Sequence, residues 1–151
     1  MVDSQRRYRY ARPMGTNDPL EPTLREATST DETPTPAMQI VRETIALSML
    51  ERMAEGMFGT LVKAVVDIKQ GIMAVGGEMH ADEEALLLGE GSPQPRLWGI
   101  NLYPAQFGTA RFIEFDSVIN IRPRQGNRTP SVDDATVRAA VTSIVERLVS
   151  R

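Results

Sequence analysis

The run Val62–Val75, VKAVVDIKQGIMAV, predicts an antiparallel β-hairpin around which the rest of the chain is expected to pack. Its first half, residues 62–68, alternates between two sides and is rich in the β-branched residues that favour strands. Residues 69–71 end in glycine, and the β-rich pattern resumes at Ile72. A short glycine-containing connection between two such runs is typical of a hairpin. The glycines that follow at 76 and 77 indicate a bend at the end of the second strand.

Two further segments predict strands that extend this sheet. Residues 97–103 alternate, with Trp98 on one side and both Asn101 and Tyr103 on the other. Residues 111–122 alternate over a dozen positions, and this segment is predicted to be the longest strand. A short edge strand is expected at residues 39–43. The links between strands are short, which favours antiparallel pairing because parallel pairs need long crossovers.

Three helices are predicted: two from the helical spacing of apolar residues, and a short one between them from the acidic residues at its start and the glycine at its end. The first covers residues 48–58 and begins with a capping-box pattern at Ser48. The second is short, at residues 80–89, and the third starts near Ser131 and carries an apolar stripe that ends at Leu148. The expected fold class is therefore α+β, with an antiparallel or mixed sheet of four to five strands and two to three helices packed on its apolar face.

The length and composition fit one domain behind an N-terminal tail. Residues 1–37 are rich in proline and threonine and poor in large aliphatic side chains, so they are predicted to be disordered. Residues 38–151 are predicted to form a single α+β domain. The tail begins with arginines and tyrosines close together. One possible function is therefore that of a structural subunit that docks to a protein partner through its tail.

Composition disfavours several classes of function. The chain has no cysteine, which removes disulfides, thiolate catalysis and cysteine-based metal sites. A net charge of −3 argues against bulk binding to nucleic acid or to an anionic membrane. There is neither a membrane-spanning apolar run nor a secretory signal pattern at the N-terminus, so a cytoplasmic location without membrane association is expected.

The loop Arg122–Pro130 carries three arginines between the longest predicted strand and the last helix. Arginine binds phosphate or carboxylate in a bidentate manner, and the amides of a helix N-terminus add donors. We therefore expect an anionic ligand here, either a phosphate-bearing small molecule or RNA, although no nucleotide-binding motif is present. The alternative is a surface loop whose arginines pair with nearby carboxylates. The predicted ligand-binding residues are Arg122, Arg124, Asn127 and Arg128 in the loop, with Asn101 and Tyr103 on the polar side of the sheet.

Carboxylates and the single histidine suggest a metal-assisted hydrolase as an alternative function. Glu78, His80 and Asp82 alternate, which would place them on one side of an extended segment. Glu114 and Asp116 share one face of the predicted fourth strand. These five residues are candidate ligands of a hard divalent cation, Mg²⁺ or Mn²⁺, and His80, Glu114 and Asp116 are the candidate catalytic residues. The simpler reading is a solvated polar face, with His80 and Asp82 satisfying the backbone at the start of the short helix.

Five ordered motifs resemble a bacterial family known only as domain-of-unknown-function family 5674. They are KAVVDI (63–68), GEMHAD (77–82), LWGINLYP (97–104), IEFDSVINIRP (113–123) and RQGNR (124–128). The resemblance covers about residues 39–150 and implies that the domain ordinarily exists alone as a small protein. It implies no activity. A binding module remains the favoured function, because the residues show no nucleophile paired with a base.

Overall fold

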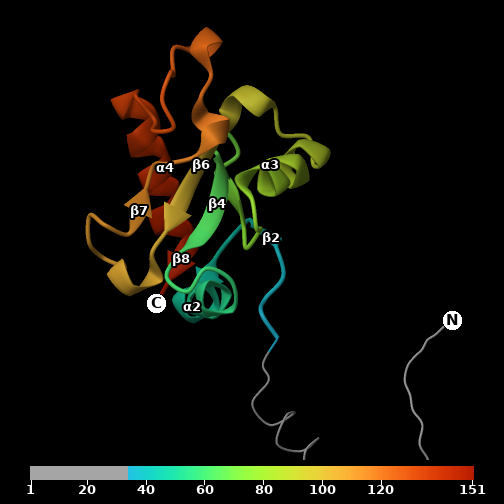
Figure 1. Ribbon diagram of the computed structural model, residues 1–151, viewed down its shortest axis with the longest axis vertical. Coiled ribbons are helices and arrows are strands. Elements are labelled where there is room, and N and C mark those ends of the chain that lie inside the picture. Colours follow the sequence, from blue (N-terminus) through green and yellow to red (C-terminus); the bar gives the residue numbers. More distant parts are fainter. Residues whose placement is uncertain (1–33) are drawn as a thin grey trace, which may run out of the picture. The chain divides into compact units, whose positions relative to one another are not determined.

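The main element of the structure is a five-stranded antiparallel sheet with the strand order β2-β5-β4-β6-β7 (Figure 1). Residues 34–151 are described by a computed structural model, so most of the predicted tail, residues 1–33, lies outside the described residues. The strands are β2 (Gln39–Val41), β4 (Val62–Asp67), β5 (Ile72–Val75), β6 (Leu97–Leu102) and β7 (Ile113–Glu114). The predicted α+β class and the predicted hairpin, which is β4 and β5, are confirmed.

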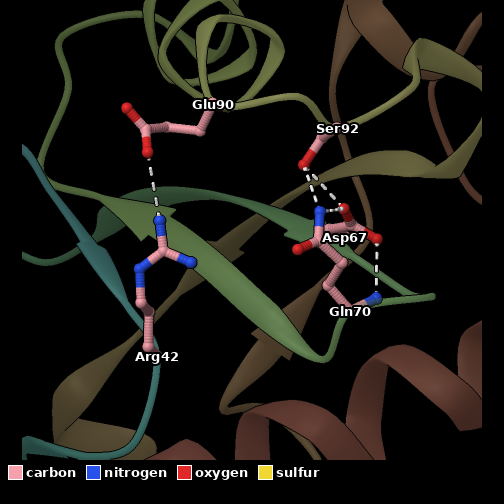
Figure 2. A network of polar contacts seen from close by, with 5 residues as sticks. All are labelled: Arg42, Asp67, Gln70, Glu90 and Ser92. Carbon is pink, nitrogen blue, oxygen red and sulfur yellow. Dashed lines mark hydrogen bonds and ion pairs between the residues drawn. The ribbon is translucent and has the colours of Figure 1, made fainter.

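The turn between β4 and β5 is held by Asp67, which is fully buried (Figure 2). Its Oδ1 accepts hydrogen bonds from the backbone N–H groups of Lys69 and Gln70 at 2.9 and 3.0 Å. Its Oδ2 accepts from Gln70 Nε2 at 2.9 Å and from Ser92 Oγ at 2.6 Å. Burial raises the pKa of Asp67, but the hydrogen bonds from Ser92, Gln70 and Lys69 outweigh it, and the pKa lies below its usual range.

One face of the sheet is covered by α2 (Leu47–Gly56) and α4 (Ala135–Leu148). The capping box predicted at Ser48 is wrong, because α2 begins after Ala46 without a side-chain cap. Helix α4 is capped by Asp134, whose Oδ1 accepts from the N–H of Thr136 at 2.7 Å. The helices bury Leu50, Met53, Val141, Val145 and Leu148 against Val62, Val66, Val75, Ile100 and Leu102 of the strands.

A second, two-stranded sheet joins the N-terminal end of α2 to the C-terminal end of α4. Its strands are β3 (Ile45–Ala46), just before α2, and β8 (Val149–Ser150), just after α4, and they pair in parallel. Four 3₁₀ turns lie in the connections of the described part of the chain: Gln94–Arg96, Pro104–Gln106, Val118–Asn120 and Pro123–Gln125. Within residues 34–151, no helix has both the length and the apolar composition to cross a membrane.

The opposite face of the sheet is partly covered by α3 (His80–Gly89), which lies across the sheet from α4 (Figure 1). Leu87 is fully buried there against Val65, Ala74 and Leu97. An exposed ion pair of 3.3 Å between Arg42 and Glu90 joins the residue after β2 to the residue after α3 (Figure 2). The side of the sheet that was predicted to be a polar, solvated face therefore has an apolar half under α3, and a polar region lies beside it.

The long strand predicted at residues 111–122 is wrong. After β7 the chain leaves the sheet, and the side chain of Asn120 takes the place of a further strand: its Oδ1 accepts from Gly99 N at 2.8 Å and its Nδ2 donates to Gly99 O at 2.9 Å. Glycine at position 99 permits this approach, since a Cβ there would lie 2.6 Å from the Cβ of Ser117. A primary amide offers the same donor and acceptor as a strand backbone, so Asn120 satisfies the backbone of Gly99 where no strand pairs with it.

Candidate functional site

Three polar residues form a row across neighbouring strands at one end of the sheet. Lys63 of β4 is the register partner of Asn101 in β6, and Asn101 is the partner of Glu114 in β7. Directly paired residues of antiparallel strands point to the same side of a sheet. The row lies on the side that also carries α3, because Val65, two positions from Lys63, packs against Leu87.

The carboxylate of Glu114 is fixed by two donors at one oxygen. Its Oε1 accepts from Asn101 Nδ2 and from the Tyr103 hydroxyl, both at 2.9 Å. Asn101 Nδ2 also donates to the backbone oxygen of Asp116 at 3.4 Å. The hydrogen bond to Glu114, with burial and the charges of Glu114 and Asp116, raises the pKa of the Tyr103 phenol. Tyr103 therefore acts as a donor over the physiological pH range.

His80, the first residue of α3, lies over this row. Its Nε2 is 2.8 Å from the backbone oxygen of Ile100. A carbonyl oxygen only accepts, so Nε2 carries the proton and Nδ1 is the basic nitrogen of the neutral ring. Burial lowers the pKa of His80, and the charge of Lys63 acts in the same direction, against the hydrogen bond to Ile100 and the contributions of Asp116 and Asn101. The imidazole is consequently neutral at pH 7.

We call Lys63, His80, Asn101, Tyr103, Glu114 and Asp116 the His80 cluster. Five of its members were candidate site residues from the sequence, and the structure brings them together. Asn101 is 7% exposed, and its Oδ1 is buried without a hydrogen-bond partner among residues 34–151. Beside Tyr103 and Glu114 lies a depression of about 460 Å³ that is also lined by Gln106, Arg111 and Ile113. The cluster thus combines a fixed carboxylate with space for a small molecule.

The sequence reasoning missed Glu83, which lies one helical turn after His80 on α3 and is fully buried. Its Oε2 accepts from Gly77 N at 2.8 Å, and its Oε1 has no partner within the described part of the chain. Burial raises the pKa of Glu83 to about 9, against the effects of the Gly77 N–H and the charge of Lys63. Its position three residues after His80 and four before the buried Leu87 was the signal that it faces the sheet.

Two of the arginine-loop residues that were predicted to bind a ligand are engaged in contacts within the protein. Arg122 is 8% exposed, its guanidinium donates to the backbone oxygens of Ile119, Gln94 and Leu97, and it lies 4.5 Å from the Trp98 ring. Asn127 Nδ2 donates to three backbone oxygens, those of Asn120, Thr129 and Ser131. Both side chains hold the loop in place.

Arg124 and Arg128 are exposed, and their guanidinium groups contact no partner among residues 34–151. The loop they occupy lies at the Leu97 end of β6, where Arg122 is bound, whereas the His80 cluster lies at the Leu102 end. Four residues of strand, from Leu97 to Asn101, span roughly 13 Å. The arginine loop and the carboxylates of the cluster therefore do not meet in one site.

The acidic residues do not form a recognisable metal centre. Among residues 34–151, no group of three or more histidine, aspartate or glutamate side chains lies close enough to hold an ion. Glu78 and Asp82 are exposed at the start of α3, apart from the Glu114 carboxylate, which hydrogen-bonds to Asn101 and Tyr103 instead. The metal hypothesis thus gains no support from the geometry.

The fold and the cluster define a small α+β domain that carries a polar cluster at the Leu102 end of β6. Its family is that of the protein of unknown function DUF5674, whose model matches residues 39–148, and the chain belongs to this family. The match runs from β2 to the last residue of α4 and includes the whole His80 cluster. No curated protein and no solved structure matches the chain.

Proposed function

We propose that the domain is a binding module for a small polar ligand and that Glu114 is its principal recognition residue. The observation that carries this proposal is the asymmetry of the Glu114 carboxylate. Its Oε1 is held by Asn101 and Tyr103, whereas its Oε2 has no hydrogen-bond partner among residues 34–151. A carboxylate that is already oriented loses little further freedom when it accepts a ligand donor, so its hydrogen bonds contribute fully to affinity.

The lining of the depression indicates the chemical class of the ligand. Glu114 accepts hydrogen bonds, while Arg111 and Gln106 supply donors on the same depression. This combination suits a molecule that carries hydroxyl or amino groups together with an acceptor. It suits a multiply charged anion poorly, because Glu114 and Asp116 would repel it.

We expect the change Glu114→Gln to weaken ligand binding about tenfold or more. Hydrogen bonds to a charged group contribute roughly 1.5–3 kcal/mol, which corresponds to about 10- to 150-fold in affinity. The measurement is a titration of ¹⁵N-labelled full-length protein with a panel of small polyols, amino acids and amines, followed at the backbone amides of Tyr103, Arg111 and Ile113. The matched control is Glu55→Gln on the exposed side of α2, which should bind like the wild type. Binding that is the same in Glu114→Gln and wild type would refute the proposal, as would a panel in which no compound shifts these amides.

A second candidate function is anion binding at Arg124 and Arg128, the part of the original hypothesis that the contacts leave open. Both guanidinium groups are exposed without a partner among residues 34–151, and the loop between them is anchored by the buried Asn127. An anchored loop with two free guanidinium groups suits a phosphate-bearing ligand or the phosphates of RNA.

The change Arg124→Ala combined with Arg128→Ala is expected to lower the affinity for inorganic pyrophosphate at least about tenfold at low salt, because two charge-assisted contacts are lost. Calorimetry at several salt concentrations measures this. Lys69→Ala, which removes the same kind of charge from the β4–β5 turn, should leave binding unchanged. Equal losses in the two variants would indicate non-specific attraction and would contradict a site in the loop.

A further inference from the structure

A second cavity, on the α4 side of the molecule, has a lining that none of the functions above uses. It measures about 610 Å³, within the range of small-molecule sites. It lies between residues 107–115 and helix α4. Its main lining side chains are Phe107, Phe112, Phe115, Ile113, Thr142 and Glu146.

Two of the aromatic residues that line this cavity, Phe107 and Phe112, pack edge to face. The rings of Phe107 and Phe112 have centroids 5.1 Å apart and an angle of 83° between their planes. Phe115 is a third aromatic residue on the same cavity. Phe112 is 4% exposed, whereas Phe107 and Phe115 are only partly buried. Aromatic faces carry negative electrostatic potential, so Phe107 and Phe115 attract a cation that lies in the cavity against them.

The structure contains one cation on this aromatic wall already. The guanidinium carbon of Arg151 lies 4.9 Å from the centroid of Phe107. This contact shows that a positive group can lie over the Phe107 ring. Arg151 is not among the residues that line the cavity, so this contact does not fill it.

Glu146 is the one charged residue in the lining, and it has no ion-pair partner among residues 34–151. We propose that the cavity binds a small organic cation with a quaternary ammonium head group. Such a head group has no N–H to satisfy, which matches a lining of phenylalanine and isoleucine with few acceptors. Phe107 and Phe115 stabilise its charge, and Glu146 supplies the counter-charge. A primary ammonium group would lose its hydrogen bonds to water in the same place.

The proposal is tested with choline and with 3,3-dimethylbutan-1-ol, which has the same shape but carries no charge. Calorimetric titration of the full-length protein is expected to show choline binding at least about fivefold tighter than the alcohol. Phe107→Leu keeps an apolar wall but loses the aromatic face, and it should weaken choline binding by about 3- to 30-fold while changing alcohol binding little. Glu146→Gln, on the exposed surface of α4, should weaken choline binding without affecting folding.

Arg151→Ala provides a test with the opposite sign. Removing the guanidinium from Phe107 frees that ring face and removes a like charge, so choline should bind about two- to fivefold more tightly than to the wild type. Three results would overturn the proposal: no choline binding by the wild type or by Arg151→Ala, equal binding of choline and the alcohol, or choline binding that survives both Phe107→Leu and Glu146→Gln.

Discussion

Truncation of Arg122 to alanine is expected to destabilise the domain by roughly 3–5 kcal/mol, a large share of the stability of a domain of this size. The guanidinium donates to carbonyl oxygens of three separate segments, those of Ile119, Gln94 and Leu97, and it stacks on Trp98. Its removal leaves these oxygens unpaired and opens a cavity beside the tryptophan ring. Each buried acceptor without a partner destabilises by about 1–3 kcal/mol.

Urea unfolding followed by the fluorescence of Trp98 measures this effect. The matched control is Arg124→Ala, two residues further along, whose exposed side chain has no partner among residues 34–151 and whose loss should change the unfolding free energy by less than about 0.5 kcal/mol. Arg122→Lys should recover only part of the stability, because one ammonium group cannot reach three separated carbonyls. Similar effects of Arg122→Ala and Arg124→Ala would show that the burial of Arg122 has no energetic weight.

The contrast between these two arginines explains why the loop could not be interpreted from the sequence. Arg122 and Arg124 are the same residue type in the same loop, and the composition that attracts an anion also suits the tethering of a loop to backbone oxygens. The outcome depends on which side chain points toward β6, and this follows from the 3₁₀ turns at residues 118–120 and 123–125. Short turns of this kind leave no periodic pattern in a sequence.

Elements with local signals were predictable. The β4–β5 hairpin and α4 follow from apolar periodicity and turn residues within a few positions of one another, and α3 follows from its acidic first turn and Gly89. The error at residues 111–122 has a non-local cause, because Asn120 replaces the strand through its side-chain amide on Gly99, 21 residues earlier. The alternation of polar and apolar residues does not reveal whether a strand or a side-chain amide pairs with the backbone of Gly99.

The residue types of the candidate site could be predicted from the sequence. Which of these residues lie next to one another was harder to predict. Asn101, Tyr103 and Glu114 follow from strand alternation, and the register places them together. Of the alternation expected over residues 111–122, only the two residues of β7, Ile113 and Glu114, lie in a strand. Glu83 was missed because an acidic residue near a helix N-terminus is usually explained by the helix dipole, which hides a buried one.

Glu83 supports the second large prediction: the domain should lose stability as the pH rises from about 5 to about 9. Burial raises the pKa of Glu83 from its usual value of 4.5 to about 9, so the folded protein keeps a proton that the unfolded chain releases. The contribution of this carboxyl is therefore fully present below pH 4.5 and is lost as the pH rises through about 9. Linkage gives a loss on the order of 5 kcal/mol over this interval.

The change Glu83→Gln is expected to remove most of this pH dependence, because glutamine has the same shape, keeps an acceptor for Gly77 N and does not ionise. Urea unfolding of both proteins at several pH values between 5 and 9 measures the difference, in which the titrations of Asp67 and His80 cancel since both proteins contain them. Glu51→Gln, on the exposed side of α2, should retain the wild-type slope. Parallel stability profiles for wild type and Glu83→Gln would mean that the carboxyl is ionised in the folded state, and that Lys63, whose charge lowers the pKa of Glu83, compensates its charge.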